Sequence, residues 1–183
     1  MPALVVTIAF NVLIRAVLLG TAMAGIRNHW VSNLAFLPNY LLMTWVISGF
    51  RVNSRTRPAL LIAALPVAAL AFWEASQVGL NSVWNHSATL AAVIFLVATL
   101  VEIHQLFLLD TTGTLGSIPG FWVATAWALD NGISLIFHSL FDFFLQTLSK
   151  PWILVPWLVV FLLGAFFNLF LARAFLCLKP QSS

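Results

Sequence analysis

One stretch in the second half of the chain carries acidic, hydroxyl and imidazole side chains at a regular spacing. Its members, at intervals of four residues, are Asp130, Ser134, His138 and Asp142. Residues four apart lie on one face of an α-helix, so these side chains would form a polar stripe about 18 Å long. Such groups can pass protons along a helix, and the unperturbed histidine pKa of about 6.5 suits exchange near neutral pH.

Further polar side chains interrupt apolar segments elsewhere. Thr7, Asn11 and Arg15 repeat the four-residue spacing near the N-terminus. Because an arginine stays charged, Arg15 needs an acidic or multi-carbonyl partner if it lies in a membrane. From the depth of each residue in its apolar segment we expect two clusters. The inner cluster comprises Arg15, Glu102, Asp130 and Asn168, and the outer cluster comprises Glu74, His138 and Asp142.

The same side chains could serve a metal-dependent enzyme, but no recognised ligand motif supports that interpretation. Carboxylate and imidazole groups suit iron, manganese, zinc or copper, and the candidate ligands would be Glu74, His138 and Asp142. The chain lacks HExxH, Glu-x-x-His and GxSxG, and its single cysteine, Cys177, excludes a CxxC motif. The sequence therefore favours a non-enzymatic role over an enzymatic one, and it identifies no cofactor.

The composition of the chain indicates the environment of the segments that carry these polar side chains. Of the 183 residues, 62% are hydrophobic and 7% are charged, whereas a soluble domain carries about 25% charged residues. A surface with so few charged side chains suits contact with lipid rather than with water. The net charge of +3 comes from basic residues that stand mostly at the ends of apolar segments. Such residues set membrane topology, so we expect the lipid bilayer, and not nucleic acid, as the partner.

Apolar segments long enough to cross a bilayer divide the whole chain. They predict an all-α, polytopic bundle of about six transmembrane helices that forms a single domain over residues 1–183. Five spans are the alternative, because the second segment contains Pro38 and Asn39. The expected spans are 3–25, 30–50, 59–80, 87–109, 121–147 and 152–177.

The distribution of basic residues predicts the orientation of these spans. Lysine and arginine concentrate on the cytoplasmic side of membrane proteins. With the N-terminus inside, the outer side holds only Arg27 and Lys150, and the inner side holds Arg51, Arg55, Arg57, Arg173 and Lys179. We therefore expect a multi-pass protein with both termini in the cytoplasm.

Three classes of function fit this pattern. A transporter or channel that couples protons to a small solute or ion explains the polar stripes most directly. A non-catalytic subunit of a larger membrane complex, or a homo-oligomer, would use the same residues to hold helices together. A metal-dependent membrane enzyme is the third class. Asp130 and His138 are the residues on which the transport hypothesis depends most.

Overall fold

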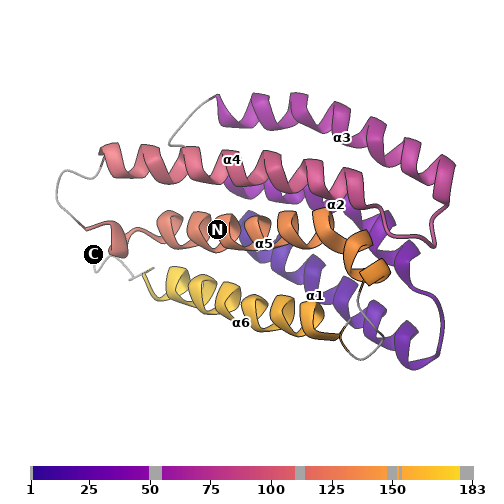
Figure 1. Cartoon of the computed structure of the whole chain (residues 1–183). Helices are drawn as coiled ribbons and strands as arrows, with labels where there is room; N and C mark the ends of the chain where they lie inside the picture. The colour runs from indigo at the N-terminus through magenta and orange to yellow at the C-terminus, as the bar shows by residue number, and fades with distance from the viewer. Residues whose placement is uncertain (1, 50–54, 110–113, 148–151, 153, 178–183) are drawn as a thin grey trace. The chain divides into compact units, whose positions relative to one another are not determined.

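The computed structural model describes residues 2–49, 55–109, 114–147, 152 and 154–177, and a few side chains inside the helices, including that of Asp142, lie outside this description. The described residues form six α-helices and a short 3-10 turn, η1, at Leu115–Ser117. In chain order the helices are α1 Pro2–Met23, α2 His29–Ser48, α3 Thr56–Val78, α4 Asn85–Leu109, α5 Pro119–Thr147 and α6 Leu154–Leu176 (Figure 1).

The all-α fold with six helices is therefore confirmed, and each predicted span coincides with one helix whose ends differ by a few residues. The doubtful segment at 30–50 forms α2 in spite of Pro38. A proline removes one N–H donor and crowds the preceding turn, but the surrounding residues continue the helix on both sides. Whether six or five of these helices span a membrane, the alternative that Pro38 and Asn39 raise, stays a prediction.

Three helices are long and apolar enough to cross a membrane, within the part of the chain that the structure describes. They are Pro2–Thr21, Thr56–Val78 and Asn85–Leu109, with mean hydropathies of 2.2, 1.8 and 2.2. The composition of α2 is less apolar, because Asn33, Pro38 and Asn39 fall inside it. Full six-fold crossing, the single transmembrane domain and the cytoplasmic termini stay predictions.

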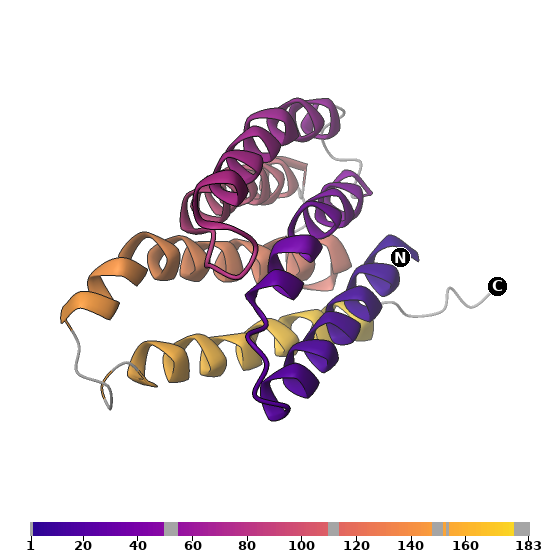
Figure 2. The ribbon, with the colours of Figure 1, turned by 90° about the vertical axis from the view of Figure 1, so that its right-hand side faces the viewer.

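The chain divides into two compact units, residues 1–91 and 92–183. In the first unit α1 packs on α2 and α2 packs on α3, and in the second α5 packs on α6 (Figures 1 and 2). The first core contains Ile47, Val67 and Tyr40, whose hydroxyl donates to the Leu60 carbonyl oxygen at 3.0 Å. Buried residues of the second unit include Val123, Ala124, Trp127, Leu171 and Ala174.

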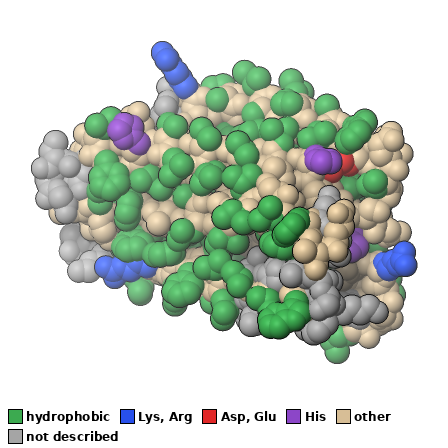
Figure 3. Space-filling view, viewed as in Figure 1, with side chains coloured by type: hydrophobic (Ala, Val, Ile, Leu, Met, Phe, Trp, Pro, Cys, Tyr) green, Lys and Arg blue, Asp and Glu red, His purple; other side chains and the backbone are tan. Residues whose placement is uncertain are grey.

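Large apolar side chains remain exposed along the helices. Leu13 on α1, Ile62 on α3 and Leu108 on α4 are 60%, 67% and 64% exposed. On the face in Figure 3, hydrophobic side chains spread widely between few charged ones. In water this much exposed apolar area would drive association, whereas against lipid tails it is the expected outer surface of a membrane helix.

The turn between α1 and α2 fixes how these helices meet. Gly25 takes a positive φ of 70°, which closes the end of α1 with little strain because glycine lacks a Cβ atom. The Ile26 N–H donates to the Thr21 carbonyl oxygen at 2.9 Å, the long bond of a Schellman motif. Asn28 Nδ2 adds a bond to the Leu18 carbonyl oxygen at 2.9 Å. The turn therefore sets α1 and α2 side by side as an antiparallel hairpin.

Candidate functional site

Helix α5 carries the stripe that the sequence predicts. It is one unbroken helix from Pro119 to Thr147, so helical geometry places the four residues of the stripe on one face. Asp130, Ser134 and His138 are each half-buried, whereas Ile136 is 62% exposed. The stripe therefore lies between the packed interior and the outer surface of the helix. The backbone of Asp142 belongs to α5, and its side chain is outside the described residues.

Glu102 is the most deeply buried acid among the described residues, with only 1% of its surface exposed. It belongs to a buried face of α4 on which Phe95, Thr99 and Leu106 recur at helical spacing. Thr99, one turn before it, donates its hydroxyl to the Phe95 carbonyl oxygen at 2.8 Å. An ionisable group at such a position in an apolar helix is costly to bury, which makes Glu102 a functional candidate.

Glu74 caps the start of a neighbouring helix, a role that the sequence did not predict. Its Oε1 accepts the His86 N–H at 2.9 Å, and its Oε2 accepts the Ser87 N–H at 2.9 Å. These amides belong to the first turn of α4, where N–H groups have no partner inside the helix and the helix dipole is positive. Glu74, a residue of α3 that is only 4% exposed, therefore caps the N-terminus of α4.

Two other side chains fasten the loop that leads into this cap. Asn33 of α2 donates its Nδ2 to the carbonyl oxygens of Leu80 and Ser82, both at 2.8 Å. Trp84 donates its indole N–H to the Gly79 carbonyl oxygen at 3.1 Å. Together with the bonds of Glu74, these bonds join α2, α3 and the start of α4 at one corner.

Arg15 lies on an exposed side of α1. Among the described residues it makes no hydrogen bond or ion pair, although its neighbour one turn earlier, Asn11, is well bonded. The guanidinium is charged at every accessible pH, so in a membrane it requires an anionic or carbonyl partner. Within the described residues of its own unit, residues 1–91, no such partner contacts Arg15.

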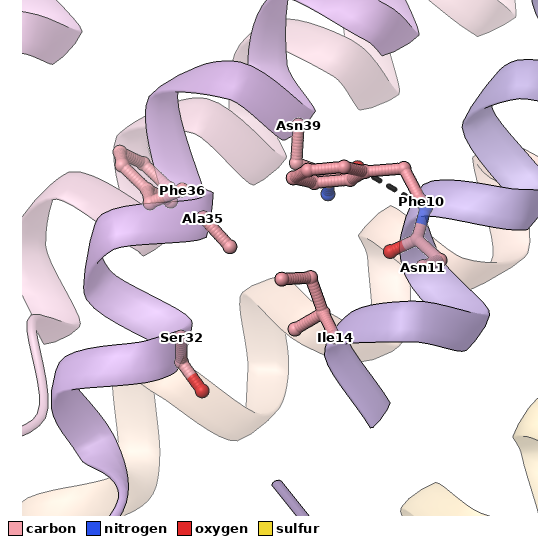
Figure 4. A pocket seen from close by; sticks show the side chains of 7 residues that line it. All are labelled: Phe10, Asn11, Ile14, Ser32, Ala35, Phe36 and Asn39. Carbon is pink, nitrogen blue, oxygen red and sulfur yellow. Dashed lines mark hydrogen bonds between the residues drawn. The ribbon is translucent and has the colours of Figure 1, made fainter. Parts of the chain in front are cut away.

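Asn11 takes part in a polar contact between α1 and α2. Its Nδ2 donates to the Thr7 carbonyl oxygen at 2.9 Å and to Asn39 Oδ1 at 3.1 Å. The two amides line a partly open pocket of about 180 Å³, shown in Figure 4. In the sequence, Asn39 stands out only as a polar residue that weakens a span, so the Asn11–Asn39 pair was not predicted. The signal was present, because two asparagines lie at similar distances from the tight turn near Gly25.

Asn168 does not contact another helix through its amide within the described residues. Its Nδ2 donates to the Gly164 carbonyl oxygen at 2.8 Å, in the preceding turn of α6, and the side chain is exposed. A Cβ atom at Gly164 would meet nothing within 4 Å. Among the described residues, no atom therefore packs closely on Gly164.

Contacts around Gly116 and Trp122 join the start of α5 to the end of α6. The Gly116 carbonyl oxygen accepts the Trp122 indole N–H at 2.8 Å and the Cys177 thiol at 3.4 Å. Trp122 stacks on Phe170, with ring centroids 5.7 Å apart, and the Arg173 guanidinium lies 5.9 Å from the Trp122 ring centroid. Aromatic and cationic side chains of this kind commonly anchor helix ends at a membrane surface.

The inner and outer clusters of ionisable residues and the metal site that the sequence predicts stay predictions. Each cluster draws residues from both units. Arg15 and Glu74 belong to the first unit, and the second contains Glu102, Asp130, His138 and Asn168. Within the described residues no group of three or more His, Cys, Asp or Glu side chains is arranged to hold a metal ion. The Asp142 side chain, the third ligand of the hypothetical site, lies outside those residues.

Comparison with known proteins gives no family for this chain. No protein family, curated protein or solved structure matches it. Its function has to be argued from its own residues.

Proposed function

We propose that this chain is a multi-pass membrane protein that moves protons, coupled to a small solute or ion, along the polar stripe of α5. The observation that carries the proposal is the half-buried position of Asp130, Ser134 and His138 on one continuous helix. A lipid-facing charge costs at least about 2.5–3.5 kcal/mol at mid-membrane, so a stripe of this kind favours contact with water or with another helix.

The roles along the stripe follow from its chemistry. Asp130 and His138 would each accept and release a proton, because carboxylate and imidazole groups both exist in protonated and deprotonated forms. Ser134, between them, can both donate and accept a hydrogen bond and would bridge the two. Glu102 is the further acid that could join the path, since Glu74 holds the first turn of α4 and is committed there.

The test is proton flux in liposomes that contain the purified protein and a pH-sensitive dye. Asp130→Asn and His138→Ala should reduce the flux to that of empty liposomes while the protein still inserts. Ser139→Ala, an exposed position on the same helix, is the control and should leave the flux unchanged. Full flux in both variants would refute the pathway.

Arg15 favours a second candidate, a subunit of a larger membrane complex. It lies thirteen residues after the start of α1 and eight before its end, so its Cα would be about 12 Å from the nearer end of the helix. Helical side chains lean toward the N-terminus, away from that end, so the guanidinium does not easily reach the lipid headgroups. A carboxylate on a helix of another subunit would neutralise it at that depth.

Blue native electrophoresis of gently solubilised membranes from the source cells tests this second candidate. If Arg15 binds a partner subunit, Arg15→Leu should shift the protein from a larger complex to its free form, whereas Arg27→Leu, in the loop after α1, should not. A complex of unchanged size in Arg15→Leu would argue against the subunit role.

A further inference from the structure

The pocket between α1 and α2 has a polar end whose hydrogen-bonding groups have a defined orientation. Asn11 Nδ2 donates to the Thr7 carbonyl oxygen, which can only accept, so this bond identifies the nitrogen of the Asn11 amide. The same nitrogen donates to Asn39, so the atom of Asn39 that accepts must be Oδ1. The remaining groups of the pair are therefore Asn11 Oδ1, an acceptor, and Asn39 Nδ2, a donor.

Both remaining groups have capacity to bind a ligand. In the described part of the chain Asn11 Oδ1 accepts no hydrogen bond, and the contact of Asn39 Nδ2 is the Met43 sulfur at 4.0 Å, a weak acceptor. Figure 4 shows the Asn11 oxygen and the Asn39 nitrogen on the pocket side of the amide pair. In an apolar surrounding, an amide group without a hydrogen-bond partner is unfavourable, so a partner is favoured.

The rest of the pocket is apolar. Phe10 and Ile14 of α1 and Ala35 of α2 line its walls, and Ser32 lies at the exposed end (Figure 4). Phe36 lies at its edge, with the ring turned away from the α1 side chains. The volume is about 180 Å³, slightly more than the cavity of about 150 Å³ that holds benzene in an engineered protein. Water needs two to four polar partners, which this lining offers only at one end. The pocket thus fits a molecule with one polar group and an apolar body.

We propose that this pocket binds an uncharged alcohol with a hydrocarbon body. A hydroxyl group can donate to Asn11 Oδ1 and accept from Asn39 Nδ2 through a single oxygen atom, which matches the two available groups. A charged head group is disfavoured, because none of the lining residues carries a charge that would offset it. Arg15, one turn after Asn11, is not among the lining residues. The hydrocarbon body would contact the apolar walls, and a longer chain would leave through the open side into the lipid.

Photolabelling in lipid nanodiscs tests this proposal. The probe is a diazirine analogue of octanol, and labelled peptides are identified by mass spectrometry. We expect labelling at the residues that line the pocket, with octanol competing and octane of equal length not competing. The Asn11→Leu variant should weaken labelling about five-fold, the loss of roughly one hydrogen bond.

A second variant keeps the test independent of the amide pair. Ser32→Phe places a ring at the exposed end of the pocket and should also reduce labelling, while Asn11 and Asn39 stay bonded. Asn168→Leu is the matched control, because it removes an asparagine that bonds its own helix outside the pocket. Equal competition by octane would overturn the proposal in favour of a merely apolar hollow. Labelling unchanged by Ser32→Phe would overturn it as well.

Discussion

At the scale of single residues, the structure separates polar groups that support the fold from those that remain available. Glu74 and Asn33 bind backbone groups of the α3–α4 corner, whereas Asp130, Ser134 and His138 lie half-buried along α5. The sequence showed that all of these are polar residues in apolar surroundings. It did not distinguish them, because the partners of Glu74 are backbone amides that carry no signature in the side-chain pattern.

The capping role of Glu74 predicts the effect of an isosteric substitution. Glu74→Gln replaces one acceptor by an NH₂ group that faces a backbone N–H, and it removes the negative charge at the positive end of α4. We expect the free energy of unfolding to fall by about 1–3 kcal/mol. Thermal unfolding in detergent measures this, with Gln77→Ala, an exposed change on the same helix, as the control. An unchanged transition in Glu74→Gln would show that the cap contributes nothing.

At the scale of elements, the length and apolarity of the segments predicted all six helices, because backbone groups in lipid have to be satisfied within the helix. The lateral contacts were not predicted in the same way. The Asn11–Asn39 bond depends on the register of the α1–α2 hairpin, which the turn at Gly25 sets. Helix order within a bundle has no such local signal, so the groupings of distant residues stay predictions.

Two glycines give opposite expectations for helix stability. A Cβ atom at Gly132, inside α5, would meet nothing within 4 Å, so Gly132→Ala should stabilise the protein by about 0.5–1 kcal/mol. Gly79, after α3, has a φ of 76° and a ψ of 177°, so Gly79→Ala should cost about 1–3 kcal/mol. Thermal unfolding of both variants checks this. A loss of stability in Gly132→Ala would mean that α5 needs the freedom of glycine at that point.

At the scale of the whole molecule, the composition and the exposed apolar side chains are those of a protein that lies in lipid. Three helices are long and apolar enough to cross a membrane, and charged side chains are few. We therefore expect the protein to stay in the membrane pellet after alkaline carbonate extraction, because removal from the bilayer would expose that surface to water. A tagged version of the chain, followed by immunoblotting, makes the measurement. Release into the soluble fraction would contradict membrane integration.

If the polar stripe of α5 borders a path open to water, cysteine side chains placed along it should react with water-soluble reagents. Cys177 is the only native cysteine, so Cys177→Ser provides a background without thiols. In that background, Ser134→Cys should react with a hydrophilic, membrane-impermeant maleimide, and Ile136→Cys, on the exposed apolar side of the same helix, should not. A Ser134→Cys thiol that stays unreactive, in protein that inserts normally, would contradict a hydrated path along α5.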